Sequence, residues 1–288
     1  MRILIGVDGS SQAVAGARWV AGLPLTASDE VIVAAVALQP VLYGAWGYIH
    51  TPATSASLAD AWEEARQAAR QTAETGAEAL GDPGCRVQAV VRDGHPVDVL
   101  TRFAHETAAD LIVVGPHGRG RLESILIGSV SQALLHAMPA AVLIAREPVS
   151  RPVRVLLATD GSSHSLAAVS YLARFPLPAD ARVAVLAVCD DRIGLQASEE
   201  RTWASEATDI ALEALAADGR DATPIIRHGD PKREILAAAR ELGSDLLVTG
   251  SRGLGGFAGL VLGSVSRALA KAAPCSVLVV PSRPEADG

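Results

Sequence analysis

The sequence repeats itself, and the repeat is the feature that most limits its fold. Residues 2–11 (RILIGVDGSS) return at 154–163 (RVLLATDGSS), an offset of 152. From Gly94 and Gly229 onward the offset is 135. A chain of 288 residues has room for two domains of ordinary size. The repeat therefore predicts a tandem duplication, with one domain over residues 1–147 and another over 152–283, joined by a proline-containing linker.

The two offsets differ by 17 residues, so the first half contains an insertion of that length. Val36 still matches Val188 at the larger offset, which places the insertion after Val36, most simply within residues 39–57. The inserted stretch contains three aromatic residues, Tyr43, Trp46 and Tyr48. A lid over a bound ligand, a surface loop and a subunit contact all fit such a segment.

Each half alternates predicted strands and helices. Continuous apolar runs such as Val31–Val36 are typical of strands covered on both faces. The expected strands are 2–7, 30–37, 86–91, 110–115, 141–145, 153–159, 181–188, 223–228, 245–250 and 276–281. The expected helices are 11–22, 58–80, 95–107, 129–137, 163–174, 197–217, 231–242 and 264–273. This order predicts an α/β fold of two tandem, doubly wound, parallel five-stranded sheets.

A glycine motif follows the fourth predicted strand of each half. It reads Gly-x2-Gly-x9-Gly-Ser in both copies, and its residues are Gly115, Gly118, Gly128 and Ser129, then Gly250, Gly253, Gly263 and Ser264. Glycine allows a sharp exit from a strand and a close approach of backbone to a ligand. The serine stands at a helix start, where free N–H groups and the helix dipole favour an anion. Two copies with identical spacing indicate phosphate binding rather than ordinary turns.

Composition excludes several classes of function. No apolar run is long enough to span a membrane, and no signal-peptide pattern is present, so we expect a cytoplasmic protein. A net charge of −7 without a basic patch argues against a nucleic-acid partner. No lysine follows a motif glycine as the usual phosphate-binding loop of ATPases requires. The cysteines, Cys85, Cys189 and Cys275, have no metal-binding spacing and are expected to act as small apolar side chains.

In a doubly wound sheet, the ligand lies at the carboxyl ends of the strands, where the strand order reverses. Repeated residues gather at those ends. Asp8 and Asp160 end the first strand, Val36 and Val188 the second, and Gly94 and Gly229 follow the third. Together with the glycine loops, four strand ends can hold an aromatic base, a ribose and a phosphate chain. An Asx-turn or a helix cap is the alternative role for each aspartate.

On these residues the chain resembles the universal stress protein family, in its ATP-binding, tandem two-domain branch. The resemblance covers nearly all of both halves and implies an adenine-nucleotide-binding fold with ATP in each half. Mg²⁺ is considered as a companion of that ATP. It implies that the aspartates contact ribose or adenine, that the valines present backbone to the adenine edge, and that the glycine loops hold the phosphates. The implied site residues are Asp8, Val36, Gly94, Gly115, Gly118, Gly128, Ser129, Val130, Asp160, Val188, Gly229, Gly250, Gly253, Gly263, Ser264 and Val265.

The first loop departs from the usual pattern of the family. Pro116 lacks a backbone donor and Glu123 adds negative charge, although Arg119 and Arg121 offset it. We therefore expect unequal affinity in the two halves, and a single bound nucleotide would point to the second half.

Three functions remain open from the sequence. The favoured one is a nucleotide-responsive regulatory module of the stress response that presents a surface to an unknown protein partner. The alternatives are a slow Mg²⁺-dependent ATP hydrolase, for which no convincing base is evident, and a nucleotide-free scaffold. The apolar last strands, 142–144 and 277–280, are candidate pairing edges, since such edges pair domains in the family. Their pairing would make an internal pseudo-dimer, and a further homodimer is open.

Overall fold

The computed structural model describes residues 1–38, 52–118, 127–146, 151–190, 197–254 and 262–282, with 52–57 and 197–201 described by their backbone alone. The elements of the first half are β1 (Arg2–Val7), α1 (Ser11–Ala21), β2 (Glu30–Ala37), α2 (Pro52–Glu78), β3 (Arg86–Asp93), α3 (Pro96–Glu106), β4 (Leu111–Val114), α4 (Ser129–Ala137) and β5 (Ala141–Ile144). Those of the second half are β6 (Arg154–Thr159), α5 (Ser163–Arg174), β7 (Arg182–Cys189), α6 (Ala197–Ala217), β8 (Ala222–His228), α7 (Pro231–Glu241), β9 (Leu246–Gly250), α8 (Ser264–Ala272) and β10 (Ser276–Val280).

All the strands form one sheet, in the order β3-β2-β1-β4-β5-β10-β9-β6-β7-β8. Within each half every strand pair is parallel, as the alternation of strands and helices predicts. The two halves meet at β5 and β10, which run antiparallel, with Leu143 opposite Leu278. The predicted pairing of the last strands is therefore present within one chain. A homodimer would need another surface, since these two strands already pair with each other.

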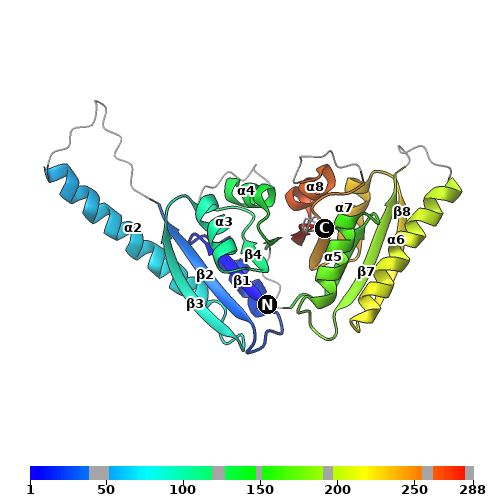
Figure 1. The fold of residues 1–288 in the computed structure, drawn as a ribbon, viewed down its shortest axis with the longest axis horizontal. Coiled ribbons are helices and arrows are strands. Elements are labelled where there is room, and N and C mark those ends of the chain that lie inside the picture. Colours follow the sequence, from blue (N-terminus) through cyan, green and yellow to red (C-terminus); the bar gives the residue numbers. More distant parts are fainter. Residues whose placement is uncertain (39–51, 119–126, 147–150, 191–196, 255–261, 283–288) are drawn as a thin grey trace, which may run out of the picture.

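Helices cover both faces of the sheet (Figure 1). Alternate strand residues face opposite sides, so Ile3 and Ile5 belong to one apolar core and Leu4 to the other. The helices α1, α2, α5 and α6 close the first core, and α3, α4, α7 and α8 close the second. Both cores contain residues of the two halves, which shows that the halves share their interior.

Side chains also link the halves directly. The ring centroids of Trp19 on α1 and Phe175 after α5 are 6.3 Å apart, and both side chains are fully buried. On another side, Arg146 follows β5 and donates hydrogen bonds to the carbonyl oxygens of Ala270 (2.6 Å) and Lys271 (3.0 Å) at the end of α8. A cation at a helix C-terminus is electrostatically favoured, so this contact stabilises the junction.

The largest error of the sequence prediction concerns α2. The helix was expected at residue 58 but begins at Pro52, inside the insertion, and is 27 residues long against 21 for α6. Proline suits the first turn of a helix because its N–H would have no partner there. The remainder of the insertion, with Tyr43, Trp46 and Tyr48, lies outside the described residues.

The three thiols differ in burial, which predicts different reactivity. Cys189 and Cys275 are buried, as expected, whereas Cys85 is half-buried. Burial raises the pKa of the Cys275 thiol to about 12, so little thiolate forms at pH 8. Iodoacetamide at pH 8 should modify Cys85 of the folded chain first, as read by mass spectrometry of its peptides. Modification of Cys189 or Cys275 in the folded chain as fast as that of Cys85 would contradict this prediction, and the same reaction in urea gives the rates of the three exposed thiols for comparison.

Within the described residues, no helix has both the length and the apolar character needed to cross a membrane.

Candidate functional site

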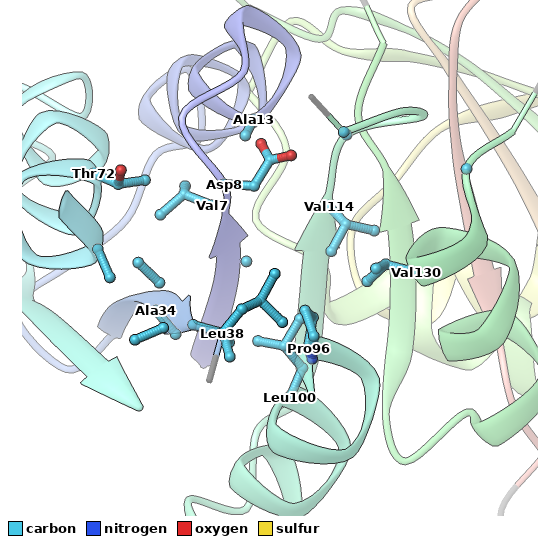
Figure 2. A pocket seen from close by; sticks show the side chains of 18 of the residues that line it. Val7, Asp8, Ala13, Ala34, Leu38, Thr72, Pro96, Leu100, Val114 and Val130 are labelled. Carbon is cyan, nitrogen blue, oxygen red and sulfur yellow. The ribbon is translucent and has the colours of Figure 1, made fainter. Parts of the chain in front are cut away.

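The candidate site of the first half is a cavity of about 610 Å³ at the carboxyl ends of its strands. It opens where the strand order reverses, between β1 and β4. Figure 2 shows Asp8 at one end of this cavity, with Val7 beside it and Val114 and Val130 across from it. The volume lies within the range of small-molecule sites.

Small and apolar side chains make most of the wall. Ala34, Ala35 and Ala37 of β2 form one side, and Leu100 of α3 forms another. Helix α2 contributes side chains at the spacing of one helix face, namely Ala65, Ala68, Ala69 and Thr72. A wall of this kind accepts a flat apolar group, because small side chains leave the space open.

Asp8 is the only carboxylate among the described residues that line the cavity. Its Oδ1 atom accepts hydrogen bonds from Ser10 N (3.0 Å) and Ser10 Oγ (2.6 Å). Ser10 is itself the N-cap of α1, since its Oγ accepts from Ala13 N. The predicted turn role of Asp8 is therefore present, and its position in the wall is compatible with ligand contact as well.

The glycine loop comes close to Asp8. A Cβ on Gly118 would lie 2.5 Å from Asp8 Oδ2. Gly128 N donates to Pro116 O (2.6 Å), and Ser131 Oγ donates to Gly115 O (2.7 Å), so the two ends of the loop are held together. Gly128 is the N-cap of α4 and, having no side chain, leaves the first N–H groups of the helix uncapped. These groups face the region where a phosphate is expected.

The second half repeats this backbone geometry. Gly263 N donates to Ser251 O (2.8 Å), and Ser266 Oγ donates to Gly250 O (2.7 Å). Asp160 Oδ1 accepts from Ser162 N and Oγ, while Oδ2 accepts from Leu254 N (2.8 Å). The bonds that join the two ends of the loop therefore recur in both halves, so the duplicated motif gives the described ends of the two loops the same hydrogen bonding.

The second half shows that Pro116 is no reason to expect weaker nucleotide binding by the first loop. Pro116 lacks an N–H, but the corresponding N–H of Ser251 donates to Val280 O (2.8 Å) at the end of β10. The donor that proline lacks would therefore join loop to strand rather than reach a ligand. The other features of that argument, Arg119, Arg121 and Glu123, lie outside the described residues.

Two histidines near the loops have a pKa below its usual value, which favours the neutral imidazole. Burial lowers the pKa of His117, and nearby Arg146 lowers it further. Burial also lowers the pKa of His164; Arg252 lowers it further, and Asp160 partly opposes this by raising it. In the ligand-free chain these imidazoles add little positive charge, so the backbone N–H groups are the expected donors to a phosphate.

The structure brings together most of the residues predicted for the first half. Those that line the cavity are Asp8, Val36, Gly115, Gly118, Gly128, Ser129 and Val130. Gly94 lies beside it instead: its N–H donates to Ala37 O (3.1 Å), and its φ of 133° is a conformation that suits glycine. The sequence reading missed the α2 wall, although the small residues at helical spacing were a usable signal.

The predicted residues of the second half occupy the matching positions, but their crevice has different surroundings. Asp160 directly follows β6, Val188 is the last but one residue of β7, and Gly229 follows β8. The loop glycines Gly250, Gly253 and Gly263 precede Ser264 and Val265 of α8. Gly229 N donates to Cys189 O (2.9 Å), as Gly94 N does to Ala37 O.

Comparisons with known proteins agree with this architecture. A sequence model of the Universal stress protein family matches residues 1–146 and again 153–281. A universal stress protein of Mycolicibacterium smegmatis is 31% identical over 98% of this chain and 97% of its own length. One from Mycobacterium tuberculosis is 27% identical over 96% of both chains. The crystal structure of a universal stress protein from Archaeoglobus fulgidus, 21% identical, superposes over 98% of both chains with a TM-score of 0.73, which shows the shared fold.

Proposed function

This chain belongs to the universal stress protein family, and from that membership we propose that its first half binds an adenine nucleotide, with ATP as the specific ligand. The bound nucleotide acts as a regulatory signal, because it changes which conformations of the chain are populated. A partner protein would then recognise the nucleotide-bound form.

The cavity of the first half carries this proposal. Its apolar walls from β2, α2 and α3 suit a purine, and Asp8 offers a carboxylate oxygen to a ribose hydroxyl. Gly118, Gly128 and the start of α4 offer space and N–H groups to the phosphates. One cavity thus supplies apolar, acceptor and anion-binding surfaces in the order in which a nucleotide presents its base, ribose and phosphates.

Mg²⁺ fits as a companion of the phosphates rather than as an ion held by protein side chains. In the described part of the chain, no group of three or more His, Cys, Asp and Glu side chains is arranged as a metal site. Magnesium commonly uses one or two carboxylates together with phosphate oxygens and water. Asp8 is the lining residue that could contribute such a carboxylate.

The test begins with the freshly purified protein. After denaturation, chromatography of the released small molecules identifies any nucleotide and gives its amount per chain. The emptied, refolded or dialysed protein is then titrated with Mg²⁺-ATP by calorimetry, with Mg²⁺-GTP as the control for the base. We expect ATP to bind and GTP to bind at least tenfold more weakly. Absence of both co-purified nucleotide and ATP binding would refute the proposal and favour a scaffold.

A further inference from the structure

Trp203 lies at a position of the second half where a small side chain would be needed to leave room for a ligand. At the offset of 135 it corresponds to Ala68, which lines the cavity of the first half. Burial supports this alignment along the two helices, because Ala69 corresponds to Ala204 and Leu80 to Leu215, all of them buried. A methyl group of the first crevice is thus replaced by an indole in the second.

The indole lies against the residues that would bound a ligand. Trp203 packs on a cluster formed by Ala187, Cys189 and Ala204. Ala187 and Cys189 end β7 and correspond to Ala35 and Ala37, which line the cavity in the first half. The side chain therefore occupies space on the β7 wall that the first half leaves open.

The other side of the indole reaches the turn after β6. Its Nε1 atom lies 3.8 Å from the point that a Cβ on Gly161 would occupy, and Ala207 Cβ lies 3.3 Å from the same point. Gly161 directly follows Asp160, the counterpart of Asp8. The tryptophan therefore extends between the end of β7 and the aspartate turn, the two places that a base and its ribose would contact.

We propose that Trp203 occupies the base position of the second crevice, so that the chain binds one nucleotide, in the first half. Indole is a planar, fused two-ring aromatic group and is the protein side chain nearest to a purine in shape and size. It fills the second crevice from within and leaves the glycine loop of that half without a ligand. This inference rests on the proposed function, since it takes the first cavity to be an adenine-nucleotide site.

Titration of the full chain with Mg²⁺-ATP tests the inference through stoichiometry. We expect about one ATP per wild-type chain and about two per chain of Trp203→Ala. Trp62→Ala is the matched control, because Trp62 lies on α2 beneath the guanidinium of Arg66 rather than in the cavity wall, and it should leave one site. Two sites in the wild type, or one site in a folded Trp203→Ala protein, would overturn the inference while leaving the proposed function intact.

Placing a tryptophan in the first half, by Ala68→Trp, tests the inference even if Trp203→Ala fails to fold. Ala68 is exposed, so Ala68→Trp should fold and should block the first crevice, lowering the stoichiometry from one to near zero. Arg70→Trp, on an exposed position of the same helix, is the control and should retain one site. The double variant Ala68→Trp/Trp203→Ala should regain one site. Unchanged binding in Ala68→Trp would count against the inference, and absence of binding in the wild type would instead refute the proposed function.

Discussion

Gly250→Ala is expected to lower the free energy of unfolding by about 3 kcal/mol, near the upper end of what overpacking costs. A Cβ on Gly250 would lie closer than 3.0 Å to three backbone atoms: the carbonyl carbon and oxygen of His164 and the nitrogen of Ser165. These atoms belong to the first turn of α5, whose start is fixed by the Ser162 cap. The clash can be relieved only by moving β9 or the helix, because no flexible side chain is involved.

The duplication supplies the control for this prediction. Gly115 is the counterpart of Gly250, but a Cβ there would meet Gln12 at 3.2 Å, an approach that small shifts relieve. Gly115→Ala should therefore cost only about 1 kcal/mol. Urea unfolding followed by circular dichroism gives both values, with unchanged slopes required for the comparison. Equal losses for the two variants would show that the contact with α5 does not determine the cost.

The strands were the easiest part of the fold to predict, and the reason is physical. A parallel strand covered on both faces must be apolar throughout, so runs such as Leu111–Val114 and Val277–Val280 stand out in the sequence. The pairing of β5 with β10 was expected because such apolar last strands pair domains in the family that the chain resembles, and the structure confirms it. The start of α2 was missed because the insertion has no counterpart in the second half to reveal its pattern.

The sequence could not predict whether the second crevice is open to a ligand, and the reason is different. Periodicity shows that Trp203 faces inward, but it does not tell whether an inward side chain fills the core or the ligand site. The hydrogen bond donated by Ser251 N–H could not be predicted either, since its acceptor, Val280 O, is far away in the sequence. The proposed role of Trp203 and the hydrogen bond of Ser251 both depend on the placement of one element against another, and local sequence patterns do not contain that information.

The paired aspartates give the second large effect. Asp8→Ala should weaken ATP binding by about 10- to 100-fold, because a hydrogen bond to a charged acceptor contributes about 1.5–3 kcal/mol. Asp160→Ala should leave the affinity unchanged, since we propose that Trp203 fills that crevice. Both substitutions also remove a serine contact, that of Ser10 Oγ (2.6 Å) or that of Ser162 Oγ (2.5 Å). Asp160→Ala also removes the hydrogen bond from Leu254 N to Asp160 Oδ2 (2.8 Å). Because Asp160→Ala disturbs its own turn as well, a loss of affinity confined to Asp8→Ala would report on the ligand.

Calorimetric titration of the two variants with Mg²⁺-ATP measures this difference, and thermal unfolding without nucleotide verifies that their stabilities are comparable. In the Trp203→Ala background the asymmetry should disappear: Asp160→Ala should then weaken the second, newly opened site, while Asp8→Ala still weakens the first. An Asp160→Ala effect as large as that of Asp8→Ala in the otherwise unaltered chain would mean that the second crevice binds nucleotide despite its tryptophan. No effect of either substitution would mean that the carboxylates serve their turns alone, as helix-capping residues do.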